Sequence, residues 1–489
     1  MLLAYARRPS GDVDVVVIGG GAAGLTAAGF AASVGAKTLL IERERLGGDC
    51  TWTGCIPSKA LLKAASVAHA ARNASKYGLK NAEPEADLAR VLERVREVQE
   101  HVYREADAPE VIERFGVEVM TGKARFVARD AVEITRGDGS RRRVRFRDAI
   151  VCSGSRPRLI AGLEGVPHLT NESVFSLTKL PRRLLVLGAG PIGVELGQAF
   201  ARLGSVVTIL DRERDILPND DPAHAAVLRE RLASEGVRFR LDAAVRSVER
   251  RGDETHLSIG DEVLVADELL VAVGRAPNVE DLGLEVAGVA TNERGIVVDE
   301  RCRTSNHRVY ACGDVAGRLQ LTHWAEHMAK VAVANAVLGV PLRLERDVVP
   351  WVTFTEPELA HVGRRTVDPR EHRTYRFPYS KVDRAVAERD DVGWVQVHAD
   401  RAGRIVGASV VGRSAGEVVA ELALAMKHGI PLRKIADTIH AYPTLALAAR
   451  RVSDQWYVQR TAPALLRMIM TLRGLRGRCP SRPQPDAIV

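Results

Sequence analysis

The sequence predicts an α/β protein with two Rossmann-like dinucleotide-binding domains followed by a C-terminal α+β domain. A strand–glycine turn–helix–strand pattern occurs near the N-terminus and again in the middle of the chain, and after residue 345 it gives way to separate short strands and a helix. The length of 489 residues is enough for about three domains. With 46% hydrophobic and 27% charged residues, the composition is that of an ordinary folded protein.

The first dinucleotide unit begins with a short apolar strand and a glycine-rich turn. Its strand, turn, helix and second strand are expected at 14–18, 19–24, 25–33 and 37–42. Gly19, Gly21 and Gly24 permit a tight turn, close approach to a pyrophosphate, and close packing of the helix on the strand. The helix N-terminus would face the phosphates, and Glu42 at the end of the second strand could accept hydrogen bonds from a ribose.

The second unit repeats each of these parts. An apolar strand at 183–187 leads into Gly188, Gly190 and Gly193, and a further strand ends in Asp211. The repeat indicates internal duplication of a nucleotide-binding unit. Two dinucleotide sites in one chain suggest a flavin and a nicotinamide, with electrons passing between them.

Other elements are expected around these two units. We predict an amphipathic helix at 90–114, a hairpin at 132–146, strands at 348–354, 375–377, 394–398 and 404–411, and a helix at 417–428. The hairpin carries the densest basic stretch: Arg141, Arg142, Arg143, Arg145 and Arg147. We expect these side chains to form a solvated face rather than an anion-binding surface.

Charge and hydropathy exclude several classes of protein. A net charge of +8 is a mild excess among 70 basic and 62 acidic residues, so it gives no reason to expect nucleic-acid binding. The sequence has no apolar run of about 18 residues or more, and its first ten residues hold no signal-peptide core. We therefore expect a cytoplasmic protein.

A close pair of cysteines, Cys50 and Cys55, follows the first unit. Bridging them requires Cα atoms about 5.5 Å apart, so the segment must bend, and Gly54 can supply the bend. A redox-active disulfide is favoured over a structural bridge or inert thiols, and no metal site is expected because no further ligands lie nearby. Lys59, one helical turn after Cys55, and a helix N-terminus would both stabilise a thiolate.

The segment 47–59 resembles the active-site segment of the FAD-dependent pyridine nucleotide–disulfide oxidoreductases. The usual pattern there is Cys-Val-Asn-x-Gly-Cys-x-Pro-[ST]-Lys, from which Thr51, Trp52 and Thr53 depart. Matching segments also occur at 151–157, 273–278, 304–314, 321–326 and 354–363, so the resemblance extends over about residues 12–460. It implies an FAD domain from 12–157 and 278–345, an NAD(P) domain at 158–277, a dimerisation domain at 346–460 and a tail at 461–489.

The resemblance also implies roles for individual residues. Cys55 would be the thiol that faces the flavin, Cys50 the thiol that attacks the acceptor, and Lys59 would lie near the flavin N5 and pair with Glu195. FAD would be bound by Gly19, Gly21, Gly24, Glu42, Lys59, Ala124, Ser153, Gly154, Asp314 and Thr322, with Asp314 at the ribityl chain and the main chain of Ala124 at the adenine. NAD(H) or NADP(H) would be bound by Gly188, Gly190, Gly193, Asp211 and Gly274. The other cysteines, Cys152, Cys302, Cys312 and Cys479, are expected to serve packing only.

The main departure from the family lies in the last domain. The family supplies a catalytic base from the other subunit in His-Pro-Thr-x-x-Glu, whereas this chain has Tyr442 in place of the histidine and Leu447 in place of the glutamate. A tyrosine with a pKa near 10 is a poor base at neutral pH. His440 is the nearby titratable alternative, although it corresponds to a non-catalytic position. Efficient reduction of lipoamide or glutathione disulfide is therefore disfavoured, and the chain looks most like the mercuric reductases of the family.

Taken with the resemblance, these residues lead us to expect a homodimeric FAD enzyme. It would pass electrons from NAD(P)H through the flavin and the Cys50–Cys55 disulfide to a metal ion or small oxidant. The alternatives are a dihydrolipoamide dehydrogenase or other disulfide reductase, and a flavin-binding scaffold without turnover. Asp211 would accept ribose hydroxyls and repel a 2′-phosphate, which favours NADH, while Arg212 and Arg214 could offset that repulsion.

The tail mixes apolar residues with arginines between 464 and 478. Gly474 and Gly477 would each lower helix stability by about 1 kcal/mol relative to alanine. We expect this segment to pack against the dimerisation domain and to end loosely, and we do not expect it to contact a membrane.

Overall fold

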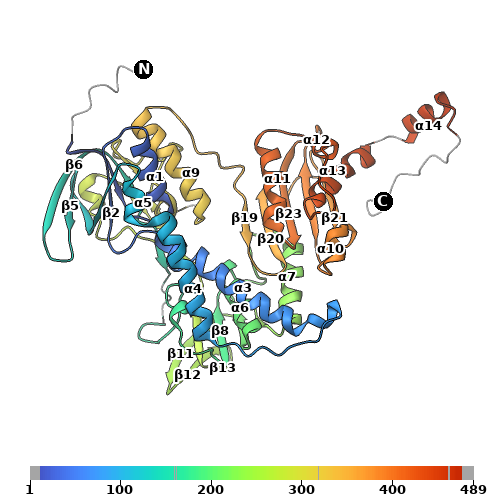
Figure 1. Cartoon of the computed structure of the whole chain (residues 1–489), viewed down its shortest axis with the longest axis horizontal. Helices are drawn as coiled ribbons and strands as arrows, with labels where there is room; N and C mark the ends of the chain where they lie inside the picture. Colours follow the sequence, from blue (N-terminus) through green and yellow to red (C-terminus); the bar gives the residue numbers. More distant parts are fainter. Residues whose placement is uncertain (1–10, 159, 161, 318, 461–462, 476–489) are drawn as a thin grey trace.

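The computed structural model describes residues 11–158, 160, 162–317, 319–460 and 463–475. Its described residues form three separate groups of strands, each accompanied by helices (Figure 1). The first two groups contain parallel sheets and the third is antiparallel. The predicted fold class, α/β with two Rossmann-like units and a C-terminal α+β domain, is therefore confirmed.

The N-terminal sheet is parallel at its centre, in the order β3-β2-β1-β6-β18, and continues through antiparallel β5 and β4. Its strands are β1 (Val13–Ile18), β2 (Thr38–Glu42), β3 (Val117–Thr121), β4 (Lys123–Ala128), β5 (Ala131–Thr135), β6 (Arg141–Val151) and β18 (Val309–Ala311). β18 follows the second sheet along the chain yet pairs with β6, so two distant stretches of sequence build this sheet. Helices α1 (Ala22–Ser33) and α9 (Thr322–Val333) pack together beside it (Figure 1).

The second sheet repeats this parallel arrangement in the order β10-β9-β8-β14. Its strands are β8 (Arg183–Leu187), β9 (Val206–Leu210), β10 (Arg238–Arg240) and β14 (Glu268–Val271), with helices α6 (Pro191–Leu203) and α7 (Pro222–Ser234). A small antiparallel sheet is inserted between β10 and β14: β11 (Val245–Arg251), β12 (Glu254–Ile259) and β13 (Glu262–Ala266). Short β7 (Ser155–Pro157) and β15 (Arg275–Pro277) pair where the chain enters and leaves this region.

The C-terminal domain is a five-stranded antiparallel sheet in the order β19-β20-β23-β22-β21. Its elements are β19 (Trp351–Thr353), β20 (Glu358–Gly363), β21 (Arg373–Pro378), β22 (Trp394–Ala399), β23 (Ile405–Gly412), α10 (Asp383–Ala387), α11 (Ala415–Lys427), α12 (Leu432–Asp437) and α13 (Leu447–Arg460). The sequence predicts four of these strands and α11, but not β20.

Several further helices pack on the sheets or on one another. They are α2 (Gly48–Trp52), α3 (Cys55–Arg72), α4 (Leu88–Val102), the π-helical turn η3 (Tyr103–Asp107), α5 (Pro109–Glu113) and α8 (Leu284–Ala287). The prediction of one continuous helix over 90–114 is wrong. The structure divides this stretch into α4, η3 and α5, and Ala108 is extended before Pro109, because a residue that precedes proline avoids helical geometry.

The predicted hairpin is confirmed in β5 and β6, whose turn is closed by a hydrogen bond from the Arg136 N–H to the Ser140 carbonyl. Arginines of β6 form ion pairs with acidic residues of neighbouring segments: Arg141 with Glu133, Arg142 with Glu118 and Arg145 with Asp130.

The sequence predicts that the tail packs against the dimerisation domain. In the structure, the described part of the tail includes helix α14 (Pro463–Leu472), which leaves apolar side chains exposed. Met468, Ile469, Leu472 and Leu475 are 52%, 42%, 76% and 58% exposed, so one chain does not cover them. The rest of the tail lies outside the described residues. Every helix in the described part of the chain is too short or too polar to cross a bilayer.

Candidate active site

The cysteine pair lies at the junction of two helices. Cys50 is in α2 and Cys55 is the first residue of α3; both are partly exposed free thiols and are hydrogen-bonded to each other. Gly54 forms the bend between the helices, and a Cβ there would lie 2.8 Å from the carbonyl oxygen of Asp49. Only glycine therefore fits the bend that brings the two thiols together.

The surroundings of the pair favour a thiolate on Cys55. The pKa of Cys55 is lowered to about 6, first by the hydrogen bond with Cys50 and then by Thr322 and the positive charge of Lys59. The sulfur of Cys55 lies 3.3 Å from the Thr322 hydroxyl, and Cys55 lies at the N-terminus of an 18-residue helix. The pKa of Cys50 is raised by its hydrogen bond to Cys55 and by burial, so Cys50 keeps its proton.

Lys59 is held beside the pair by a buried carboxylate. Its Nζ lies 3.0 Å from Oε2 of Glu195, which is on α6 and only 5% exposed. The second oxygen of Glu195 accepts the N–H of Phe354 at 2.8 Å, and Nζ of Lys59 lies 4.3 Å from the Phe354 ring centroid. Packing of α3 on α6 brings these residues together from three distant parts of the sequence.

The first glycine turn fits a dinucleotide. A Cβ on Gly24 would lie 1.8 Å from the Gly19 carbonyl oxygen, so α1 and β1 can approach this closely only with glycine at position 24. Gly19 has a φ of +103°, and a Cβ there would lie 2.3 Å from the Cys152 carbonyl oxygen. Gly21 precedes α1 without any side-chain cap, which leaves the helix N–H groups available to phosphates. Glu42, the last residue of β2, accepts the Gly20 N–H at 2.7 Å and thereby fixes the turn that follows β1. These residues would hold FAD.

A second polar cluster surrounds Asp314, three residues after the end of β18. Asp314 accepts the Ser155 hydroxyl at 2.5 Å, and Arg275 donates to the Ser155 hydroxyl at 2.7 Å and to its carbonyl oxygen at 2.9 Å. Arg275 also forms an ion pair with Asp49, the residue before Cys50. Arg275 is largely buried, and burial lowers its pKa. The cluster ties the cysteine segment to the segment of Asp314.

The second glycine turn has the same construction. A Cβ on Gly193 would lie 1.9 Å from the Gly188 carbonyl oxygen, whereas no atom lies within 4 Å of one on Gly190, which leaves open space for a phosphate. Asp211 accepts the Ala189 N–H at 2.6 Å, so its carboxylate lies beside the turn. Gly274 has a φ of +107° and similarly open surroundings. These residues would hold NAD(P).

Comparisons with known proteins agree with this geometry. The family described as "Pyridine nucleotide-disulphide oxidoreductase" matches residues 13–329, and its dimerisation domain matches residues 349–451. The chain belongs to this family. Family members are FAD-dependent oxidoreductases that use NAD(P)H, so the predicted enzyme class and cofactors are confirmed. The dimerisation domain supports a homodimer.

Similar members of the family have different activities. The chain is 34% identical to the mercuric reductase of Bacillus cereus over 89% of this chain and 70% of that protein. It is 36% identical to dihydrolipoyl dehydrogenase 2 of Haloarcula marismortui over 91% and 97%. Among solved structures it resembles the Cu(II) complex of the HOCl-induced flavoprotein disulfide reductase RclA from Escherichia coli, with 26% identity, a TM-score of 0.80 and coverage of 90% and 99%. It also resembles LpdA from Mycobacterium tuberculosis, with 27% identity, a TM-score of 0.84 and coverage of 91% and 100%.

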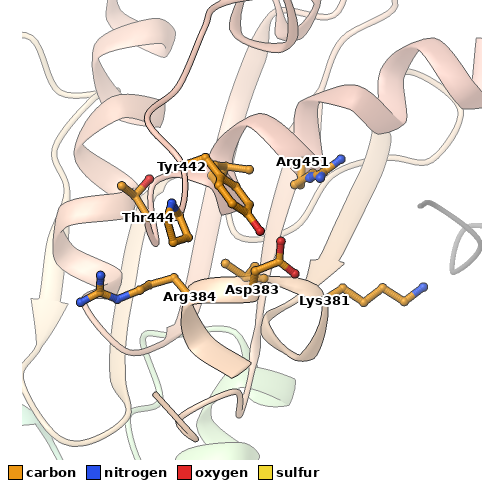
Figure 2. Close-up of a pocket in the computed structure, with 9 residues that line it drawn as sticks. Lys381, Asp383, Arg384, Tyr442, Thr444 and Arg451 are labelled. Carbon is orange, nitrogen blue, oxygen red and sulfur yellow. The ribbon is translucent and has the colours of Figure 1, made fainter. Parts of the chain in front are cut away.

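Figure 2 shows the surroundings of Tyr442, the residue at which the chain departs from the family pattern. Tyr442 is 68% exposed and points its hydroxyl at Asp383, and that hydrogen bond raises the pKa of the tyrosine. The two residues line a small hollow together with Arg384, Thr444 and Arg451. The phenol is therefore a proton donor to Asp383 at neutral pH.

Leu447 and His440 have different surroundings. Leu447 is 7% exposed and lines the same hollow as Tyr442. His440 has its Nε2 2.9 Å from a carboxylate oxygen of Glu421 and its Nδ1 2.9 Å from the Thr438 carbonyl oxygen. Both ring nitrogens of His440 therefore already have partners within the chain.

The remaining predicted residues lie away from the cysteine pair. Ala124 is in β4, in register with Ile134 of β5. Ser153 donates its hydroxyl to the Asn278 carbonyl at 2.8 Å, and Gly154 has a φ of +70°. Cys152, Cys302 and Cys312 are buried, while Cys479 lies outside the described residues. Within the described residues there is no group of three or more His, Cys, Asp or Glu side chains that could hold a metal ion.

Sequence reasoning missed several residues that the fold brings to the site. They are Asp49, Ser155 and Arg275 beside Asp314, Phe354 beside Lys59, and Gln99 and Asp107 behind Cys50. Arg275 lies in a segment that matches the family, which is a signal that could have found it. The positions of Gln99 and Asp107 give no such signal, because their contacts depend on how α4 and η3 pack.

Proposed function

We propose that this chain uses NAD(P)H to reduce a metal ion, such as Hg(II) or Cu(II), or another small oxidant, with Cys50 and Cys55 as the redox-active pair. The observation that supports the proposal is the identity and hydrogen bonding of residue Tyr442. This residue occupies the position of the family's catalytic base, yet it is a phenol that donates to Asp383.

The chain's own residues would manage charge and protons around the pair. Bound FAD supplies a two-electron carrier between NAD(P)H and the disulfide. Opening the Cys50–Cys55 bond consumes two electrons and one proton and leaves a thiol on Cys50 and a thiolate on Cys55. The lowered pKa of Cys55, together with Lys59 held by Glu195, stabilises that thiolate.

The acceptor decides whether a further proton donor is needed. A disulfide acceptor takes up two electrons and two protons to give two thiols, so its reduction depends on a well-placed acid and base. Hg(II) takes two electrons to become Hg(0), and two Cu(II) ions take one each to become Cu(I), in both cases without a proton. Two sulfurs side by side are suitable soft ligands for such cations.

The similar proteins favour the same acceptor class. One is named a mercuric reductase and another is named as a Cu(II) complex of a disulfide reductase. In the homodimer, Tyr442 and its hollow would face the cysteine pair of the other subunit. Loss of a general base there lowers the rate of disulfide reduction by a factor on the order of 10²–10⁴.

Dihydrolipoyl dehydrogenase activity is the second candidate. It is supported by the 36% identity to the Haloarcula marismortui protein, which the match covers almost completely. This activity requires Tyr442, with Asp383, to replace the family's histidine in proton transfer.

We also propose that NADH is the preferred donor. The carboxylate of Asp211 lies beside the second glycine turn, where a ribose would bind, and it would repel a 2′-phosphate.

An acceptor screen tests these proposals. Purified protein reconstituted with FAD is assayed anaerobically with NADH and with NADPH against Hg(II), Cu(II), quinones, lipoamide and small disulfides. We expect the highest kcat/KM with a metal ion or small oxidant and with NADH. A kcat/KM for lipoamide at least as high as that for every other acceptor would contradict the proposed acceptor class.

A further inference from the structure

The short helix that carries Cys50 depends on α4 and η3 for its position. α2 has five residues, too few to be stable as an isolated helix. Gln99 of α4, which is 5% exposed, donates its side-chain N–H to the carbonyl oxygens of Thr51 at 3.1 Å and Trp52 at 2.7 Å. These are carbonyl groups that a short helix leaves without internal partners.

Asp107, the last residue of η3, holds the same helix by a side chain. Its Oδ2 accepts the Thr51 hydroxyl at 2.6 Å and lies so near the start of α2 that a Cβ on Gly47 would be 2.8 Å from it. The π-helical geometry of η3 brings this carboxylate to Thr51, and π-helical turns occur frequently at functional sites.

Trp52, the last residue of α2, also helps to hold the helix in place. Its Nε1 donates to the Leu46 carbonyl at 2.8 Å, and its ring lies 5.3 Å from that of Tyr103. The Arg45 guanidinium lies 3.7 Å from the Trp52 ring centroid and pairs with both carboxylate oxygens of Glu100. Arg45 is thus already neutralised by Glu100.

We propose that Asp107 is a positioning residue of the redox centre, which holds α2 through Thr51 and places a negative charge next to the neighbour of Cys50. This charge adds to the Cys50–Cys55 hydrogen bond and to burial in keeping the proton on Cys50, so that the thiolate forms on Cys55. This inference rests on the proposed redox role of the cysteine pair. It concerns which sulfur is charged and not the identity of the acceptor.

The charged groups around the pair are consistent with this role. The pKa of Cys50 is raised first by its hydrogen bond with Cys55 and by burial. The charge of Asp107 adds to this increase, whereas the hydrogen bond with Thr322 opposes it. Lys59 and Glu195 act on Cys55 instead.

Asp49, the residue before Cys50, is paired with Arg275. Burial raises the pKa of Asp107 itself, while the hydrogen bond from Thr51 lowers it. The negative charge of Asp107, and with it the increase in the pKa of Cys50 that this charge causes, therefore grows as pH rises and Asp107 ionises.

The experiment measures the ionisation of Cys50 alone. In a Cys55→Ser background, the rate of alkylation of Cys50 by iodoacetamide is followed between pH 5 and 10 by mass spectrometry of the peptide that contains it. Asp107→Asn removes the charge with little change of shape, and Asp107→Ser removes it with a smaller side chain. Thr51→Val keeps the charge and removes the hydrogen bond. Glu105→Gln, at an exposed position of the same turn, is the matched control.

We expect both Asp107 variants to increase the alkylation rate at pH 7.5 by about threefold to tenfold and to move its midpoint to lower pH. Thr51→Val and Glu105→Gln should not lower the midpoint. The inference is wrong if the Asp107 variants titrate like Glu105→Gln, or if Thr51→Val lowers the midpoint as much as they do. Failure of the underlying proposal has a different signature: NADH reduction of the unaltered enzyme would then produce no long-wavelength thiolate–flavin absorbance.

Discussion

At the scale of single residues, the reduced centre directs its negative charge to one sulfur. Cys55 receives a hydrogen bond from Cys50, lies 3.3 Å from the Thr322 hydroxyl and is near the ammonium group of Lys59. The same hydrogen bond lowers the pKa of Cys55 and raises the pKa of Cys50. The two thiols therefore differ in acidity although they are close in sequence, and we propose that this difference separates the thiol that would face the flavin from the one that would meet the acceptor.

This asymmetry predicts the pH dependence of the reduced enzyme. Since the pKa of Cys55 is lowered to about 6, its thiolate is present above that pH and is lost as pH falls through it. The long-wavelength absorbance of the NADH-reduced enzyme should titrate with a midpoint near pH 6. Thr322→Val, which removes a hydrogen bond to the thiolate, should raise that midpoint by about one pH unit. An unchanged midpoint would show that Thr322 does not stabilise the thiolate.

Asp211 is predicted to select between the nicotinamide cofactors. Its carboxylate both supports the turn at Ala189 and repels a 2′-phosphate, so two substitutions are needed to separate these effects. Asp211→Asn keeps a hydrogen-bond acceptor and removes the charge, and Asp211→Ala removes both. Each should lower the ratio of kcat/KM for NADH to that for NADPH by about tenfold. A constant ratio in steady-state assays would exclude Asp211 as the selector.

At the scale of elements, the turns and strands that could be predicted from the sequence are mostly those that local sequence determines. The two glycine turns, their flanking strands and the β5–β6 hairpin follow from short-range requirements of backbone geometry. The break of the 90–114 helix also has a local cause, Pro109, which hydrophobic periodicity alone does not show, whereas strand β20 depends on pairing with distant β23. The same division holds in the site: Cys50, Cys55 and Lys59 are local in sequence, whereas Asp107 and Phe354 reach it through tertiary contacts.

The two glycine turns are predicted to serve different cofactors. Gly24→Ala places a Cβ 1.8 Å from a backbone carbonyl of the first turn and should abolish FAD binding. Gly193→Ala creates the corresponding clash, at 1.9 Å, in the second turn and should leave FAD bound but slow its reduction by NADH. Gly29→Ala, also on α1 and with no atom within 4 Å, is the control and should behave like the unaltered protein. Flavin absorbance and stopped-flow reduction distinguish these outcomes, and loss of FAD in both turn variants would contradict the assignment.

At the scale of the whole molecule, three regions must cooperate. Lys59 of α3, Glu195 of α6 and Phe354 of the loop after β19 meet at one point, so the N-terminal, middle and C-terminal parts of the chain are coupled at the cysteine pair. The dimerisation domain then adds the Tyr442 hollow, which lies in the C-terminal part of each chain (Figure 2). Acceptor choice is thus expected to depend on a surface that only the dimer completes.

This arrangement predicts a gain of function. Tyr442→His places an imidazole next to Asp383, which can orient it as a base without a buried glutamate at the position of Leu447. Lipoamide reductase turnover should rise by a factor of up to about 10². Tyr442→Phe provides no acid–base group and should show no such rise. Equal activity of the two variants would mean that the shape of the acceptor site, and not the base, limits disulfide reduction.

The central claim is that electrons from NADH reach the Cys50–Cys55 pair through the flavin, with Cys55 as the flavin-facing thiolate. An anaerobic titration with NADH, followed by the long-wavelength thiolate–flavin absorbance, tests it most directly. We predict that the unaltered enzyme develops this absorbance on reduction, that Cys55→Ser retains FAD but never develops it, and that Cys50→Ser shows it without any reductant because Cys55 is left unpaired. If the two serine variants have the same spectra before and after NADH, the assignment of the two thiols, and with it the account of this site, is contradicted.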